Sequence, residues 1–219
     1  MARPVNQRPY DAEGRRSQSA ATRQRIVDVA RRLILANGYR AATVRAIAAA
    51  ADVHVDTVYE LVGRKPQLLR ELIEQALSGV DHPVEAEARD HVRRMRATAD
   101  PVEKLAIYAR AVTSTHARLA PLFMALRDAS STEPEAREVW QQISERRATN
   151  MRKLVAELAA TGGLREGLSV AEGADIMWAT NSPELYVLFT AERRWSAEQY
   201  EAWLADAWCR LLLERPRPR

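Results

Sequence analysis

The side chains best suited to bind another molecule lie between Thr43 and Lys65, in the segment TVRAIAAAADVHVDTVYELVGRK. This segment reads as two short helices joined by a tight turn. The second helix carries polar and aromatic side chains on the face that its apolar residues leave free. Hydroxyl, guanidinium and ammonium groups donate to phosphate oxygens, and a guanidinium also matches O6 and N7 of guanine. The pattern therefore predicts a helix-turn-helix that enters DNA.

No set of residues is spaced for catalysis or for metal binding. HExxH, GxSxG, a Walker loop and CxxC do not occur, and the four histidines are scattered at positions 54, 82, 91 and 116. Cys209 is the only cysteine, so an intrachain disulfide is impossible and a partly buried thiol is expected. We expect a protein that is not an enzyme and that uses no cofactor or metal.

Local signals predict the helices that would position the DNA-facing residues. Within residues 22–37, apolar residues recur at spacings of three and four and form one stripe of a predicted helix. Gly38 supplies the left-handed residue that ends it. Thr43 is a good N-cap for a helix that reaches about residue 51, and Asp52 occupies the turn. A third helix follows over residues 55–62, and Pro66 begins a fourth.

The faces of these helices are predicted from their spacing. Val58 and Val62 should anchor the third helix in the core. The outer and flanking faces are then left to Val55, Asp56, Thr57, Tyr59, Glu60 and Leu61. The second helix is rich in alanine, which predicts a close helix crossing through Ala46, Ala48, Ala49 and Ala50.

Charge is divided unevenly along the chain. Residues 1–70 carry 13 Lys and Arg against 6 Asp and Glu, a net of +7, and the remainder carries 20 against 23, a net of −3. This asymmetry is expected when one end meets a polyanion. Residues 1–20 read as a flexible basic arm, which either contacts DNA or is a solvated tail. The sequence shows no secretory signal or membrane-spanning run, so we expect a cytoplasmic protein without a membrane partner.

The remainder of the chain predicts a larger helical domain over residues 81–219. One helix is expected at about 84–99, and a second begins after the cap at Asp100-Pro101. A third is expected over 132–160 and would be the longest. Capping boxes at Ser169 and Ser196 open two more helices, and Pro183 is expected to kink a helix between them. Aromatic and methionine residues suggest either ordinary core or the wall of a ligand pocket: Tyr108, His116, Phe123, Met124, Trp178 and Tyr186. The fold class is all-α, with about nine or ten helices and no sheet.

Five features together resemble the N-terminal domain of the TetR (tetracycline-repressor-like) family. They are a first helix ending in ANG, the TVRAIA start of the second, the A-x-V turn, the TVY core of the third and the G-x-K-x-x-L-L entry to the fourth. They lie between residues 22 and 77, and the domain is expected over 21–80. The resemblance implies a homodimer that pairs through its last two helices, recognition helices in successive major grooves, and a ligand-binding C-terminal domain.

The resemblance also implies roles for residues that match the family's motif. Thr43 and Lys65 would contact phosphates, Arg45 would reach a base or a phosphate, and Thr57 and Tyr59 would touch base edge or backbone. Leu61 replaces what is often an aromatic residue or histidine, and Asp56 and Glu60 are unusual charges beside a polyanion. The predicted function is a ligand-responsive regulator, most simply a repressor, that a small apolar ligand releases from a palindromic operator. The alternative is a helical dimeric interaction protein without sequence-specific DNA binding, and a weaker one is a cofactor-free helical enzyme.

Overall fold

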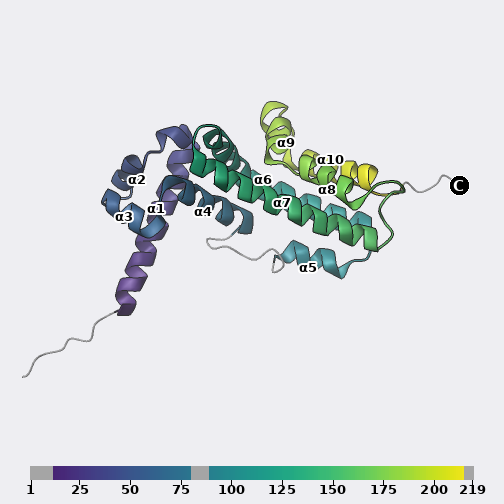
Figure 1. The fold of residues 1–219 in the computed structure, drawn as a ribbon, viewed down its shortest axis with the longest axis horizontal. Helices are drawn as coiled ribbons and strands as arrows, with labels where there is room; N and C mark the ends of the chain where they lie inside the picture. Colours follow the sequence, from purple (N-terminus) through teal and green to yellow (C-terminus); the bar gives the residue numbers. More distant parts are fainter. Residues whose placement is uncertain (1–11, 80–88, 215–219) are drawn as a thin grey trace, which may run out of the picture. The chain divides into compact units, whose positions relative to one another are not determined.

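The structure is a computed structural model, and it describes residues 12–79 and 89–214 (Figure 1). Within these ranges there are ten α-helices and no strand, apart from one isolated antiparallel bridge between Leu164 and Leu213. The all-α prediction is confirmed. The helices are α1 (Ala12–Ala41), α2 (Val44–Ala50), α3 (Val55–Val62), α4 (Lys65–Ser78), α5 (Asp90–Ala97), α6 (Pro101–Ser130), α7 (Pro134–Ala160), α8 (Val170–Thr180), α9 (Pro183–Val187) and α10 (Ala197–Leu212).

The chain divides into two compact units. The first ends at Leu68, and the second, which we call the body, begins at Leu69. The division falls within α4, whereas the sequence analysis ended the DNA-binding domain at residue 80. The domain boundaries remain a prediction.

The first unit is a small helical domain built on α1. Ile26, Val27, Ala30 and Ile34 are buried along one stripe of α1, which packs against α2 and α3. Gly38 has a φ of 79°, outside the helical region, and ends the regular part of α1 where its sequence predicted.

Helix α1 begins at Ala12, ten residues earlier than the sequence predicted. Residues 14–21 are exposed, so this first part of the helix has no apolar stripe from which it could be recognised. Arg15 and Arg16 of the predicted basic arm therefore lie on α1. Arg3 and Arg8 lie outside the described residues.

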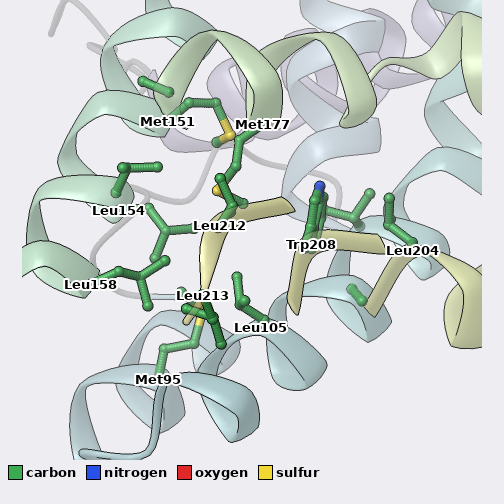
Figure 2. Close-up of a cluster of buried hydrophobic side chains, with 14 of the residues drawn as sticks. Met95, Leu105, Met151, Leu154, Leu158, Met177, Leu204, Trp208, Leu212 and Leu213 are labelled. Carbon is green, nitrogen blue, oxygen red and sulfur yellow. The ribbon is translucent and has the colours of Figure 1, made fainter. Parts of the chain in front are cut away.

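The body is organised around one apolar cluster (Figure 2). It joins Met95 of α5, Leu105 of α6, Leu154 of α7 and Met177 of α8 to Trp208 of α10. Trp208 is fully buried, and its indole N–H donates to the hydroxyl of Thr180 at 2.7 Å. Trp208, one of the aromatic residues late in the chain, is therefore part of the core.

Several helix boundaries in the body match the sequence and two do not. Asp100, Ser169 and Ser196 cap α6, α8 and α10 as predicted, the last two with complete capping boxes. Helix α6 continues through Pro121 for 30 residues, so α7, with 27, is not the longest. Pro183 begins the separate helix α9 behind the N-cap Ser182 rather than kinking a continuous helix. The predicted helix over 84–99 is described only as α5.

Candidate functional site

The turn between α2 and α3 has the geometry of a helix-turn-helix. The Thr43 hydroxyl accepts from the backbone N–H of Ala46 at 3.1 Å and so caps α2. Asp52 adopts a φ of 52°, the left-handed conformation predicted for the turn. Gly63, with a φ of 85°, ends α3 and allows the chain to enter α4. Local sequence therefore specifies the cap of α2, the turn after it and the end of α3.

Two arginines of α1 fix α2 and α3 in place. Arg23 Nε donates to the carbonyl of Leu61 in the last turn of α3 at 3.1 Å, and Arg25 Nε donates to the carbonyl of Ala51 at the end of α2 at 3.0 Å. Carbonyls at helix C-termini lack intrahelical partners and carry partial negative charge, so a guanidinium is well matched to them. Sequence analysis missed both positioning roles, because the partners lie 38 and 26 residues away.

The predicted DNA-facing side chains differ in exposure. Thr43, Arg45, Asp56, Tyr59 and Glu60 are exposed, and Tyr59 keeps 48% of its surface accessible. The remaining four are half-buried: Val55, Thr57, Leu61 and Lys65. Five of the nine side chains are thus accessible to a partner, and the other four are partly covered by the protein.

Other residues of the helix-turn-helix depart from prediction. Val58 is buried to 1% exposure, but Val62 is only half-buried. On α2, Ala48 is buried while Ala49 and Ala50 are exposed, so the close crossing uses fewer alanines than predicted. The short α2 has only seven residues and turns its last alanines to solvent.

Lys65 has an aromatic neighbour in its own unit. Its Nζ lies 3.7 Å from the centre of the Tyr39 ring, within the range of a cation–π interaction. This contact holds the ammonium group near the start of α4. A phosphate contact by Lys65 would therefore be made from a positioned side chain.

The body contains a cavity of about 510 Å³. Its walls come from α4, α6 and α7, with Arg89 and His91 at the start of α5 and Asn181 after α8. Of the six predicted pocket residues, Tyr108 and Phe123 line this cavity. The other four are not among its lining residues: His116, Met124, Trp178 and Tyr186.

The cavity wall carries a half-buried cation. Arg147 Nη2 donates to the backbone carbonyl of Trp178 at 3.1 Å and to that of Asn181. Its guanidinium carbon lies 5.6 Å from the Phe123 ring centre and 5.3 Å from that of Trp178. Burial lowers the pKa of Arg147, although an arginine remains protonated at neutral pH. Arg147 was not predicted, because apolar and aromatic residue types alone do not mark a charged side chain as part of a cavity wall.

His116 is buried behind the cavity wall. Its ring lies edge-on to Tyr186, with centres 5.8 Å apart, and its Nδ1 has no hydrogen-bond partner among the described residues. Burial, with a smaller effect of the Arg147 charge, lowers the pKa of His116 to about 3. The imidazole is therefore neutral and buried against Tyr186, and its predicted contact with a ligand stays a prediction.

Two further findings concern the described residues. No described helix is both long and apolar enough to cross a membrane. Among the described side chains, no three of the His, Cys, Asp and Glu type are grouped so that they could hold a metal ion.

Comparisons with known proteins agree with this architecture. Residues 26–72 match the family model of bacterial regulatory proteins of the tetR family. No curated protein matches the sequence.

Similar solved structures extend over most of the chain. One is a protein assigned as a transcriptional regulator from Saccharomonospora viridis in complex with choline, with TM-score 0.67, 18% identity, and coverage of 90% of this chain and 100% of that one. A second is the fatty acid degradation regulator FadR from Bacillus halodurans, with TM-score 0.65, 22% identity, and coverage of 90% and 97%. A third, assigned to the TetR family, comes from Mesorhizobium loti, with TM-score 0.66, 18% identity, and coverage of 90% and 99%.

These structures share the fold of this chain, and the family model matches the segment that forms the helix-turn-helix described above. Over residues 26–72 the chain is therefore similar to the tetR family of bacterial regulatory proteins, and over most of its length it shares the fold of these solved structures.

Proposed function

We propose that the chain is a ligand-responsive repressor that binds a palindromic operator as a homodimer. In this proposal two recognition helices, α3 from each copy, lie about 34–36 Å apart to meet successive major grooves. A small molecule in the body cavity changes that spacing and releases the DNA, to the extent that it binds one spacing more tightly than the other.

The main support for DNA binding is the exposed surface of a helix-turn-helix whose two helices are hydrogen-bonded to side chains of α1. Arg23 and Arg25 fix the ends of α3 and α2, so the exposed groups of Thr43, Arg45 and Tyr59 are presented by positioned backbone. Thr43 and the first N–H groups of α2 suit a phosphate, and Arg45 suits a guanine.

Two acidic side chains give the recognition helix its selectivity in this proposal. Asp56 and Glu60 are exposed and one helical turn apart, so they share a face of α3. Carboxylates near phosphates are unfavourable unless each accepts a hydrogen bond, and the amino group of cytosine is the base group that offers one. Asp56 also lies in the first turn, where the helix dipole favours it. The pair would therefore penalise most DNA sequences.

The proposed homodimer uses the last two helices, as inferred from the family resemblance. Apolar side chains at this end of the body are accessible: Leu188 is 47% exposed and Leu211 is 37% exposed. Phe189 packs against Trp195 and Trp203, with ring centres 4.4 and 4.5 Å apart. Exposed leucines beside half-buried aromatic rings have the composition of an interface core.

The effector site in this proposal is the body cavity. One of the similar structures holds choline, which supports a fold of this kind taking a small molecule. The sequence predicts a small apolar effector, whereas the wall of the cavity also carries charged groups.

A DNA-binding experiment tests the proposal. Purified protein should select a palindrome from a random duplex pool and shift a fragment from upstream of its own gene, with affinity that falls steeply as salt rises. Arg45→Ala and Lys65→Ala should both weaken binding, and only Arg45→Ala should relax the sequence preference. Arg165→Ala is the matched control, because Arg165 is exposed on the body and should leave binding unchanged.

The alternative function, a helical dimeric interaction protein, predicts a different outcome of the same selection. In that case the dimer enriches no sequence, and Arg45→Ala has the same effect as Lys65→Ala. Such a result would overturn the repressor proposal while leaving the fold and family unchanged.

A further inference from the structure

The body cavity is lined by more positive than negative charge. Among the described residues that line it there are five cationic side chains against one carboxylate, that of Glu74: Arg70, Arg89, Arg146, Arg147 and Lys153. Arg146 is paired with Glu74 at 2.6 Å, and Arg70 donates to Gln142 at 2.8 Å. Positive charge therefore predominates among the described lining residues, which favours an anion over a neutral or cationic ligand.

Arg147 is the cation with the most unusual surroundings. Both of its hydrogen bonds are made by Nη2, to two backbone carbonyls, and no carboxylate of a described residue lies within 4 Å of its guanidinium. The N–H groups of Nε and Nη1 bond to no described residue. Among the described carboxylates, that of Glu184 acts on Arg147 through its charge, beyond ion-pair distance, and partly offsets the lowering of its pKa by burial. A half-buried guanidinium that faces a cavity and forms no ion pair with a described residue is a site that an oxyanion can complete.

A phenol lies beside this guanidinium. Asn181 links the two groups, because its backbone carbonyl accepts from Arg147 and its side-chain amide donates to the Tyr108 hydroxyl at 2.9 Å. The Tyr108 hydroxyl in turn donates to the sulfur of Met151 at 3.7 Å. A thioether is a weak acceptor, so a ligand carboxylate would accept this O–H hydrogen bond more strongly than the sulfur does. Burial raises the pKa of Tyr108 to about 12, which keeps the phenol a donor.

One part of the wall is apolar. Val112, Leu119 and Phe123 of α6 face the cavity together with Ile143 of α7. A smaller cavity of about 130 Å³ shares Tyr108 and other lining residues with the first, and Met95 and Leu154 add apolar surface there. Polar donors beside an apolar part of the wall suit a ligand with a charged group and an apolar part.

We propose that the ligand of the body cavity is an amphipathic organic anion, whose carboxylate accepts from Arg147 and Tyr108 and whose apolar part packs against Phe123 and its neighbours. The inference rests on the proposed function in one respect, that this ligand is the effector. Binding of the anion is a property of the body alone and can be measured without DNA.

The test uses the full chain and matched probes that share a skeleton and differ only in the polar group. Hexanoate, octanoate and decanoate are compared with the alcohols and the trimethylammonium salts of the same chain lengths, by thermal shift and by calorimetry. At least one carboxylate should bind with a submillimolar Kd and should bind more tightly than its alcohol and its ammonium partner. The proposal is overturned if no carboxylate reaches this affinity, or if an alcohol or ammonium probe binds equally well at every length.

Variants assign the binding to the named groups. Arg147→Met should weaken the best carboxylate by about tenfold or more while changing the affinity for the alcohol by less than about twofold. Tyr108→Phe keeps the ring that stacks on Trp208 and should weaken the carboxylate several-fold. Because Arg147 also holds the end of α8, Arg147→Lys is a second variant that keeps the charge and should retain part of the affinity. Arg165→Ala is the control.

The outcomes separate this inference from the proposed function. Carboxylate affinity that is unchanged in Arg147→Met and in Tyr108→Phe would overturn the inference even if the protein binds its operator. Carboxylate binding that depends on both residues, in a protein that selects no DNA sequence, would leave the inference standing and refute the repressor. Release of DNA by the same carboxylate would support both.

Discussion

His116 should make the protein sensitive to acid. In the unfolded chain its imidazole takes up a proton below a pKa of about 6.5, whereas the folded protein excludes the proton until about pH 3. The unfolded state therefore binds more protons throughout this window, and stability falls as pH falls. Between about pH 7 and about pH 5 the loss amounts to about 2 kcal/mol, at about 1.4 kcal/mol for each pH unit below 6.5.

Replacement with a side chain of similar volume that cannot titrate isolates this effect. Free energies of unfolding for the wild type and His116→Leu are measured by urea denaturation at several pH values and one protein concentration. The stability of the wild type minus that of His116→Leu should fall by about 2 kcal/mol between about pH 7 and about pH 5, whatever its value at neutral pH. His54→Gln is the control, because His54 is exposed and its variant should follow the wild type. Parallel curves for wild type and His116→Leu would refute the buried, neutral histidine.

Three other changes test separate parts of the structure. Arg23→Ala removes the hydrogen bond to the end of α3 and should lower stability by about 1 kcal/mol in thermal unfolding, whereas Arg32→Ala on the exposed side of α1 should not. Gly173→Ala should destabilise although alanine favours helices, because its Cβ would lie 2.9 Å from Val155 Cγ1; a Val155→Ala background should reduce the loss, and equal losses would contradict this packing. Glu60→Gln should raise affinity for random duplex about two- to threefold at low salt in a gel shift, and no increase would argue against proximity to phosphates.

The features that sequence could predict are those specified within a few residues. Thr43, Asp100 and Ser169 cap helices through bonds to backbone groups two or three residues away, so their local sequence is sufficient. The left-handed turn at Asp52 is likewise local. These short-range signals are why the helix-turn-helix and most helix starts could be predicted.

The cavity could not be predicted in the same way, because residues far apart in the sequence build it. Tyr108 and Asn181, 73 residues apart, meet through a side-chain hydrogen bond. Residue type made Tyr108 a candidate for the pocket wall, but His116 and Trp178 were candidates equally, and these lie outside the lining. An inward-facing helical residue becomes core or wall according to how the next helix packs, and that information is absent from the pattern.

Arginines that hold helix ends change what the basic composition of the chain means. Arg23, Arg25 and Arg147 each donate to backbone carbonyls at the C-terminal ends of helices, where the helix dipole is negative. Their charges still contribute to the field around the protein, but the bonded N–H groups of Arg23 and Arg25 are directed at the protein's own backbone. The net charge of +7 over residues 1–70 therefore overstates the number of side chains that can bind a phosphate. DNA binding should depend on fewer arginines than composition suggests, with Arg45 prominent among them because it is exposed at the start of α2.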